Sequence, residues 1–193
     1  MVVKKIWRTA AVAFAICTRK PALLLLMALS GLVSAQQSPD AKSNEPPAQK
    51  SPAPNALTQA AVQQGILNCA FRINQLTQLL GFNDQSGALL LTPPNAPDQR
   101  VVPLAMEIPL GADSAYVSVQ FAPNQANGCG ASYDAVVYWP KACDEVARQQ
   151  FAGIRNLGVL KKNITALDGG PATKVFLMAA GSGCLSIKKE VVL

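Results

Sequence analysis

The fold class is predicted most directly by AYVSVQFAPNQANGCGASYDAVVYW, residues Ala115–Trp139. The first seven residues alternate between apolar and more polar side chains, which is typical of a strand with one buried face. The side chains expected to face inward are Val117, Val119 and Phe121. The loop Asn124–Gly130 then leads into a second apolar strand at Ala131–Trp139. Two strands joined by so short a connection predict an antiparallel sheet.

Two more strands are predicted upstream of this pair. GALLLT at Gly87–Thr92 is a short apolar run that ends at two prolines, and RVVPLAMEIPL follows at residues 100–110. In the second run, the side chains expected on one face are Val102, Leu104, Met106 and Ile108. Pro103 and Pro109 lack the backbone N–H that a central strand donates, so this strand is predicted at an edge of the sheet.

A helix is predicted before these strands, at Leu57–Leu80. Apolar residues recur there at steps of four and three, which forms one seam along a helix. The seam consists of Val62, Ile66, Cys69, Ile73, Leu76 and Leu80. Leu67 and Phe71 add a second apolar stripe, so contacts on two sides are expected, and Gly81 is the expected C-terminal cap. The seam could be a dimer interface, but core packing is preferred because Cys69 needs a partner within the chain.

The residues after the central strands predict a second helix and three more strands. KACDEVARQQFAGI at 141–154 places Asp144 and Glu145 in the first helical turn, where negative charge is favourable. The strands are expected at 157–167, 173–180 and 184–193, and a hairpin turn joins the last two. The predicted order is α-β-β-β-β-α-β-β-β. It indicates an α+β fold, a curved and mostly antiparallel sheet with two helices on one face. No internal repeat is visible in the sequence.

Cysteine spacing predicts two disulfides. The chain has five cysteines; Cys17 belongs to an N-terminal leader, and the others are Cys69, Cys129, Cys143 and Cys184. These four contain no C-x-x-C pair and the protein has no histidine, so a metal site is not expected. A strand of roughly 30 Å separates Cys129 from Cys143, which excludes that pair. Cys69–Cys143 is preferred because both residues lie on predicted helices, and it leaves Cys129–Cys184. The alternative joins Cys69 to Cys129 and Cys143 to Cys184.

The first 56 residues predict an export signal and a linker. PALLLLMALSGLV at Pro21–Val33 follows basic residues and precedes small ones, as in a secretory signal peptide (residues 1–35) cleaved after Ala35. The run is shorter than the roughly 20 residues of a membrane-spanning helix, so no membrane span is expected after cleavage. Residues 36–56 are rich in Pro, Ala, Ser and Gln and predict a disordered linker, which leaves 57–193 as a single domain. Export and disulfides predict a location in the bacterial periplasm or outside the cell.

Charge and composition exclude several function classes. The formal net charge is +6, but five of the 17 basic residues lie in the first 20 positions. From Gln36 onward there are 12 basic and 11 acidic residues, so the mature chain is nearly neutral and a nucleic-acid partner is not expected. The absence of histidine excludes Ser-His-Asp and Cys-His catalytic sites. We assign no catalytic residue, no cofactor and no metal.

Two weaker catalytic patterns can be weighed. Ser186-Ile-Lys-Lys189 has the S-x-x-K spacing, but residues three apart on a strand point to opposite faces, so this pair is not expected to act together. Six acidic residues could supply a carboxylate pair for glycan hydrolysis. They are Asp84, Asp98, Glu107, Asp113, Asp134 and Asp168. Asp134 interrupts an apolar strand, and we expect it to be an exposed carboxylate on a sheet face.

We therefore expect a binding, assembly or inhibitor protein whose partner is a protein or an envelope component. A histidine-free, carboxylate-dependent hydrolase of envelope glycans is the alternative. The candidate contact residues are Tyr116, Tyr138, Trp139, Lys161, Lys162, Lys188 and Lys189. If the last strands are neighbours, their lysines would form a basic patch. In an inhibitor, the disulfide-bounded loop Asn124–Gly130 would be the inserting element. We assign no oligomeric state.

Overall fold

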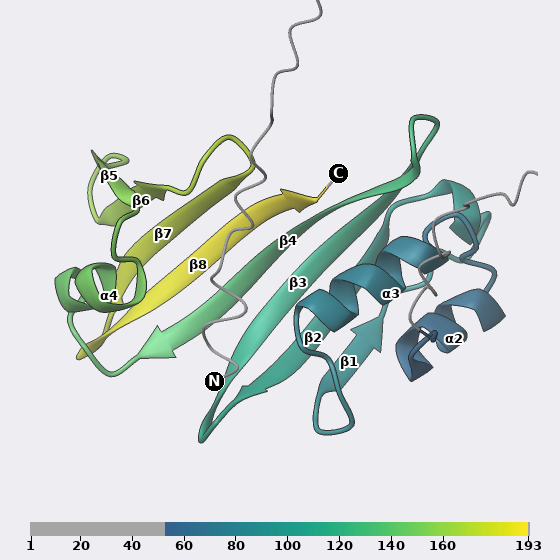
Figure 1. Cartoon of the computed structure of the whole chain (residues 1–193), viewed down its shortest axis with the longest axis horizontal. Coiled ribbons are helices and arrows are strands. Elements are labelled where there is room, and N and C mark those ends of the chain that lie inside the picture. The colour runs from purple at the N-terminus through teal and green to yellow at the C-terminus, as the bar shows by residue number, and fades with distance from the viewer. Residues whose placement is uncertain (1–52, 193) are drawn as a thin grey trace, which may run out of the picture. The chain divides into compact units, whose positions relative to one another are not determined.

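The computed structural model describes residues 53–192. The predicted signal peptide and most of the predicted linker lie outside the described residues. The helices are α2 (Ala56–Gln63), α3 (Ala70–Leu79) and α4 (Cys143–Gln150), with a 3-10 turn η1 (Pro97–Gln99). The strands are β1 (Gly87–Leu90), β2 (Val102–Leu110), β3 (Asp113–Asn124), β4 (Gly128–Trp139), β5 (Arg155–Val159), β6 (Ile164–Asp168), β7 (Thr173–Ala180) and β8 (Gly183–Val192). They form one antiparallel sheet, which confirms the predicted α+β class (Figure 1).

Two four-stranded meanders meet in the middle of this sheet. The strand order is β1-β2-β3-β4-β8-β7-β6-β5, so the meanders join where β4 pairs with β8. A helix precedes each meander, α3 before β1 and α4 before β5, and both helices lie on the same face of the sheet (Figure 1). The described chain therefore consists of two halves with the same order of elements, and the antiparallel pairing of β4 with β8 gives the topology a two-fold arrangement, although the sequence shows no repeat.

The two disulfides follow this division into halves. Cys69 bonds to Cys129 and Cys143 bonds to Cys184, with Cα atoms 5.1 and 5.0 Å apart. The preferred pairing of Cys69 with Cys143 is wrong, and the alternative pairing is the observed one. The reason is that α3 and α4 pack on different halves. Cys69 directly precedes α3 and Cys143 is the first residue of α4, and each bonds to the second residue of the last strand in its own meander.

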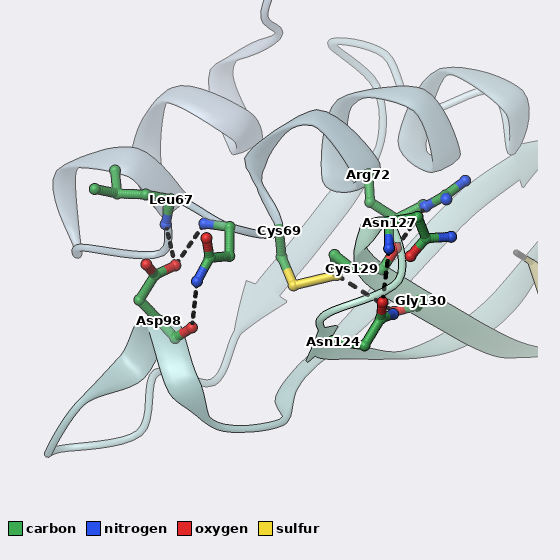
Figure 2. Close-up of a disulfide and its surroundings, with 9 residues drawn as sticks. Leu67, Cys69, Arg72, Asp98, Asn124, Asn127, Cys129 and Gly130 are labelled. Carbon is green, nitrogen blue, oxygen red and sulfur yellow. Dashed lines mark hydrogen bonds between the residues drawn. A yellow bond between two sulfur atoms is a disulfide. The ribbon is translucent and has the colours of Figure 1, made fainter.

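The predicted single helix at 57–80 is also wrong, because two helices occupy this segment. Gly65 lies between α2 and α3. Its φ of +80° is in the left-handed region that favours glycine. The Asp98 carboxylate accepts hydrogen bonds from the backbone N–H groups of Leu67 (2.7 Å) and Asn68 (2.5 Å), just before α3 begins (Figure 2). A residue distant in sequence therefore satisfies amide groups at the start of the second helix.

The apolar seam belongs to the core despite the break. Five of its six residues are buried, and only Val62 is exposed, so the seam cannot serve as a dimer interface. Leu67 and Phe71, the expected second stripe, are exposed as well, so the second contact of α3 does not use them; it is made with α2, through side chains such as Asn74 and Thr77. Gly81 has a φ of +84° and donates its N–H to the carbonyl of Gln78, which confirms the predicted cap.

Two predictions about strands also need correction. β2 is not an edge strand, since it lies between β1 and β3. Pro103 and Pro109 both fall outside Leu104–Glu107, the stretch that pairs with β1, so neither missing N–H interrupts that pairing. The single strand expected at 157–167 is a hairpin, in which β5 and β6 pair across a turn at residues 160–163. This hairpin raises the number of strands in the second half to four.

Candidate functional site: the helix-free face of the sheet

The face opposite the helices carries two adjacent rows of apolar side chains. The strand registers place the first row side by side across five strands: Tyr116, Val136, Ile187, Phe176 and Ala166. The second row contains Tyr138, Leu185, Met178 and Ile164. We call these nine residues the apolar strip. Among the described residues no helix covers this face (Figure 1), and five strands about 4.8 Å apart make the strip about 20 Å long.

Two tyrosines are the most exposed members of the strip. Tyr116 is 53% exposed and Tyr138 is 46% exposed, and the register places them on adjacent strands of the same face. The position of Tyr138 depends on Gly183, its diagonal neighbour on β8. Gly183 is buried, and a Cβ atom there would overlap the Tyr138 hydroxyl and the carbonyl oxygen of Trp139. The Tyr138 side chain therefore lies against the bare glycine backbone.

A row of charges borders the strip on one side. Lys189 contacts Asp134 at 2.9 Å, and Lys174 contacts Asp168 at 3.1 Å, in neighbouring register positions on the same face. The Arg155 guanidinium and Lys174 hold the pKa of the Asp168 carboxyl well below its usual range, mainly through hydrogen bonds to the ionised form. Positive and negative groups neutralise one another here, so the border is polar without a strong net charge.

Three of the six acidic residues considered for hydrolysis, Asp98, Asp134 and Asp168, have other identified contacts. Asp134 lies on the helix-free face, as expected, but it is ion-paired and 34% exposed. Asp134 and Asp168 are three strand spacings apart, about 14 Å, which exceeds the roughly 10 Å that a carboxylate pair spans in glycosidases. Asp98 accepts the two backbone hydrogen bonds before α3. These contacts give Asp98, Asp134 and Asp168 structural roles.

The candidate lysines are not brought together. Lys161 and Lys162 are exposed in the β5–β6 turn. Lys189 lies on the helix-free face, whereas Lys188, the preceding residue on β8, lies on the helix side and is only 3% exposed. Adjacent residues of a strand point to opposite faces, so the basic patch does not form.

Trp139 is also separated from the two tyrosines. It lies on the helix side of β4, where its Nε1–H donates a 2.7 Å hydrogen bond to the Ser186 hydroxyl. The ring packs against the apolar clusters of both halves. Ser186 and Lys189 lie on opposite faces, as predicted for a strand, so the S-x-x-K spacing does not assemble a catalytic pair. Of the three candidate aromatic residues, only the two tyrosines share the candidate surface.

A buried polar cluster on the helix side was missed by sequence reasoning. Lys188 Nζ donates to the Tyr133 hydroxyl at 2.9 Å and contacts the Glu190 carboxylate. The Tyr133 hydroxyl donates to Glu190 Oε2 at 2.7 Å. Burial raises the pKa of Tyr133 above its usual range, and the hydrogen bond to Glu190 adds to this effect. The alternating polar residues at 186, 188 and 190 were the available signal, but such alternation ordinarily marks a solvent-facing side.

The loop Asn124–Gly130 is tighter than the sequence suggested. The strands extend to Asn124 and from Gly128, which leaves a three-residue turn. The Asn124 side-chain oxygen accepts hydrogen bonds from the N–H groups of Ala126 and Asn127, both at 3.0 Å. Figure 2 shows the Cys69–Cys129 disulfide beside this turn, and Figure 1 shows that the turn projects beyond the sheet.

Comparison with known proteins adds no relative: no family model matches the sequence, and no curated protein or solved structure matches it significantly. Within residues 53–192, no three His, Cys, Asp or Glu side chains are grouped so that they could hold a metal ion. The same part of the chain has no helix with the length and apolar character to cross a membrane. Its two disulfides are compatible with a location outside the cytoplasm. These features define a disulfide-stapled α+β protein with an apolar sheet face.

Proposed function

We propose that the protein is an exported binding protein that recognises a protein partner through the apolar strip. The observation that carries this proposal is the pair of half-exposed tyrosines, Tyr116 and Tyr138, on a helix-free sheet face. Tyrosine is enriched among the residues that dominate binding energy at protein interfaces, because it buries a large apolar ring and keeps a polar end. Both rings belong to strands in the middle of the sheet, so the surface beneath them is rigid.

The size of the strip favours a partner other than a second copy of the chain in a permanent dimer. With a length of about 20 Å and a width of about 12 Å, the strip covers on the order of 250 Å². A stable interface buries about 800 Å² on each side, so the strip would form only the apolar centre of a contact. The charged row along its border would then form the polar rim, as in many non-obligate interfaces.

Export is the second part of the proposal. The predicted signal peptide supports it, as do the two disulfides, since disulfides persist mainly in oxidising compartments. The partner is therefore expected in the bacterial envelope or outside the cell. The two disulfides hold α3 and α4 on the opposite face of the sheet. They therefore help the strip to keep its shape outside the cytoplasm.

A matched pair of variants tests this function. The protein and its variants are immobilised and exposed to solubilised envelope proteins, and retained proteins are identified by mass spectrometry. Tyr116→Ser with Tyr138→Ser should lose a partner that the unchanged protein retains. Phe71→Ser is the control, because Phe71 is an exposed aromatic residue (65%) on α3, on the helix side. The proposal is refuted if the tyrosine variant retains the same proteins, if the unchanged protein retains none, or if the control loses the same partner.

A further inference from the structure

The strand β5 forms an open edge of the sheet. It pairs with β6 on one side, and no strand of residues 53–192 lies on its other side. All five of its residues are exposed, including Leu157 (48%) and Val159 (55%). An open edge presents backbone N–H and C=O groups to which an extended chain can add as a further strand.

A hollow lies beside this edge on the helix side. It has a volume of about 360 Å³, and the residues that line it include Ala147, Arg148, Phe151, Ile154, Asn156 and Leu167. They come from α4, the α4–β5 connection, β5 and β6. Phe151 and Leu167 are buried and make the hollow apolar. We call the open edge and this hollow together the β5–α4 groove. In strand addition, alternate side chains of the added segment point to one face, where such a hollow can accept one of them.

The other half differs on the helix side, although β1 is likewise an edge strand with no strand of residues 53–192 on its other side. There, α2 packs beside α3, and Figure 1 shows α2 on the β1 side of α3. Leu57 and Ala61 of α2 are buried in the apolar cluster of that half. Among the described residues no second helix accompanies α4. The position beside α3 is therefore covered by α2, whereas the corresponding position beside α4 is open.

The charge around the groove indicates the kind of segment that would fit. Residues 148–163 contain four basic residues and no acidic one. Arg155 contacts Asp168, whereas Arg148, Lys161 and Lys162 are exposed and have no carboxylate of the described residues within ion-pair distance. A second copy would bring the same positive charges together, and the irregularity between Asn156 and Gly158 also disfavours pairing with an identical edge. An acidic segment would be attracted instead.

We propose that the β5–α4 groove binds an extended acidic peptide segment by strand addition to β5, with one apolar side chain in the hollow. This second binding site goes beyond the proposed function, because it uses neither Tyr116 nor Tyr138. The partner chemistry follows from three separate features: the unpaired edge sets the extended conformation, the hollow accepts the apolar side chain, and the basic rim selects the acidic flanks.

Synthetic peptides test the proposal directly. The probes are fluorescent nine-residue peptides with Val, Ile, Leu or Phe at the centre and alternating Glu and Thr around it, measured by fluorescence anisotropy with the disulfide-bonded protein. At least one peptide should bind, and binding should weaken as salt is added. Methylation of the backbone nitrogens along one edge of the peptide should abolish binding, whereas methylation along the other edge should not. The proposal is overturned if no peptide binds, if lysine-flanked peptides bind equally well, or if both methylated forms bind alike.

Variants of the protein separate this site from the apolar strip. Lys161→Glu with Lys162→Glu should weaken binding of the best peptide by about tenfold or more, since both changes lie in an exposed turn and reverse the rim charge. Ala147→Phe should weaken it by filling the hollow. Tyr116→Ser with Tyr138→Ser should bind the peptide unchanged, so failure here and failure of the proposed function are distinguishable. Circular dichroism checks the folding of each variant. The protein could instead form a dimer through the groove. A dimer that persists when the peptide is added, but is lost in the Lys161→Glu variant, would show a second copy in the groove and overturn the proposal.

Discussion

Replacing Cys69 and Cys129 by alanine should lower the free energy of unfolding by about 4 kcal/mol, and replacing Cys143 and Cys184 should lower it by nearly the same amount. The bridges span sequence separations of 60 and 41 residues. For loops of these lengths the chain-entropy relation gives about 4.3 and about 3.9 kcal/mol at 25 °C, because the cost of closing a loop grows only with the logarithm of its length.

The two losses should be additive. The loops closed by Cys69–Cys129 and Cys143–Cys184 do not overlap in sequence, so each bridge restrains a different part of the unfolded chain. A variant without either bridge should therefore lose about 8 kcal/mol, which is comparable to the whole stability of a typical domain, about 5–15 kcal/mol. We expect that variant to be largely unfolded at 37 °C.

Urea unfolding followed by tryptophan fluorescence measures these changes. Trp139 packs against the apolar clusters of both halves, so its emission reports on each of them. Each single-bridge variant should unfold in one transition, with a lower midpoint and similar changes in the two variants. A loss below about 1 kcal/mol for either bridge would refute the chain-entropy reasoning. Two separate transitions would instead show that the halves unfold independently despite the β4–β8 joint.

Three further changes test individual contacts, each by the urea midpoint. Gly183→Ala should cost about 1–3 kcal/mol, because the added Cβ overlaps the Tyr138 side chain, and truncating Tyr138 in the same protein should recover part of the loss. Lys188→Met should cost about 2 kcal/mol or more by leaving the Glu190 carboxylate without its cation, whereas Lys188→Met with Glu190→Gln should cost less; equal losses would contradict the coupling. The lowered pKa of Asp168 means that its ionised form stabilises the fold above about pH 4, and that this stabilisation is lost as the pH falls further. Asp168→Asn should flatten the acid side of the stability profile, and an unchanged profile would contradict this reasoning.

Local patterns were sufficient to predict most of the sheet. The alternation in β2, β3 and β4 depends only on neighbouring residues, and the buried positions follow it. The hairpin of β5 and β6 was missed because its turn, residues 160–163, contains neither glycine nor proline. The break at Gly65 was missed for another reason: α2, the turn and α3 all contact one core, so the helical spacing of buried residues continues across the interruption.

Long-range relations could not be predicted in the same way. The disulfide pairing depends on which half of the sheet each helix covers, and a single sequence without a visible repeat does not show that division. Only part of the candidate surface was predicted from the sequence. Tyr116 and Tyr138 follow from the alternation within their strands. Alternation also places Trp139 on the face opposite Tyr138, so its separation from the tyrosines could have been anticipated. The members of the apolar strip on β6, β7 and β8 depend on the contact of β4 with β8, which joins residues about 55 positions apart in the sequence.

The two proposed surfaces should respond differently when one half of the molecule is weakened. The apolar strip crosses the β4–β8 joint, with Tyr116 and Tyr138 on one side and the β6–β8 residues on the other. It therefore requires both halves to be folded and paired. The β5–α4 groove lies wholly in the second half, where Cys143–Cys184 fastens α4 to β8. Under conditions in which both variants remain folded, removing Cys69–Cys129 should thus weaken partner binding at the strip more than peptide binding at the groove. Removing Cys143–Cys184 should weaken both, because the groove loses the anchoring of its α4 wall and the strip loses the support of β8.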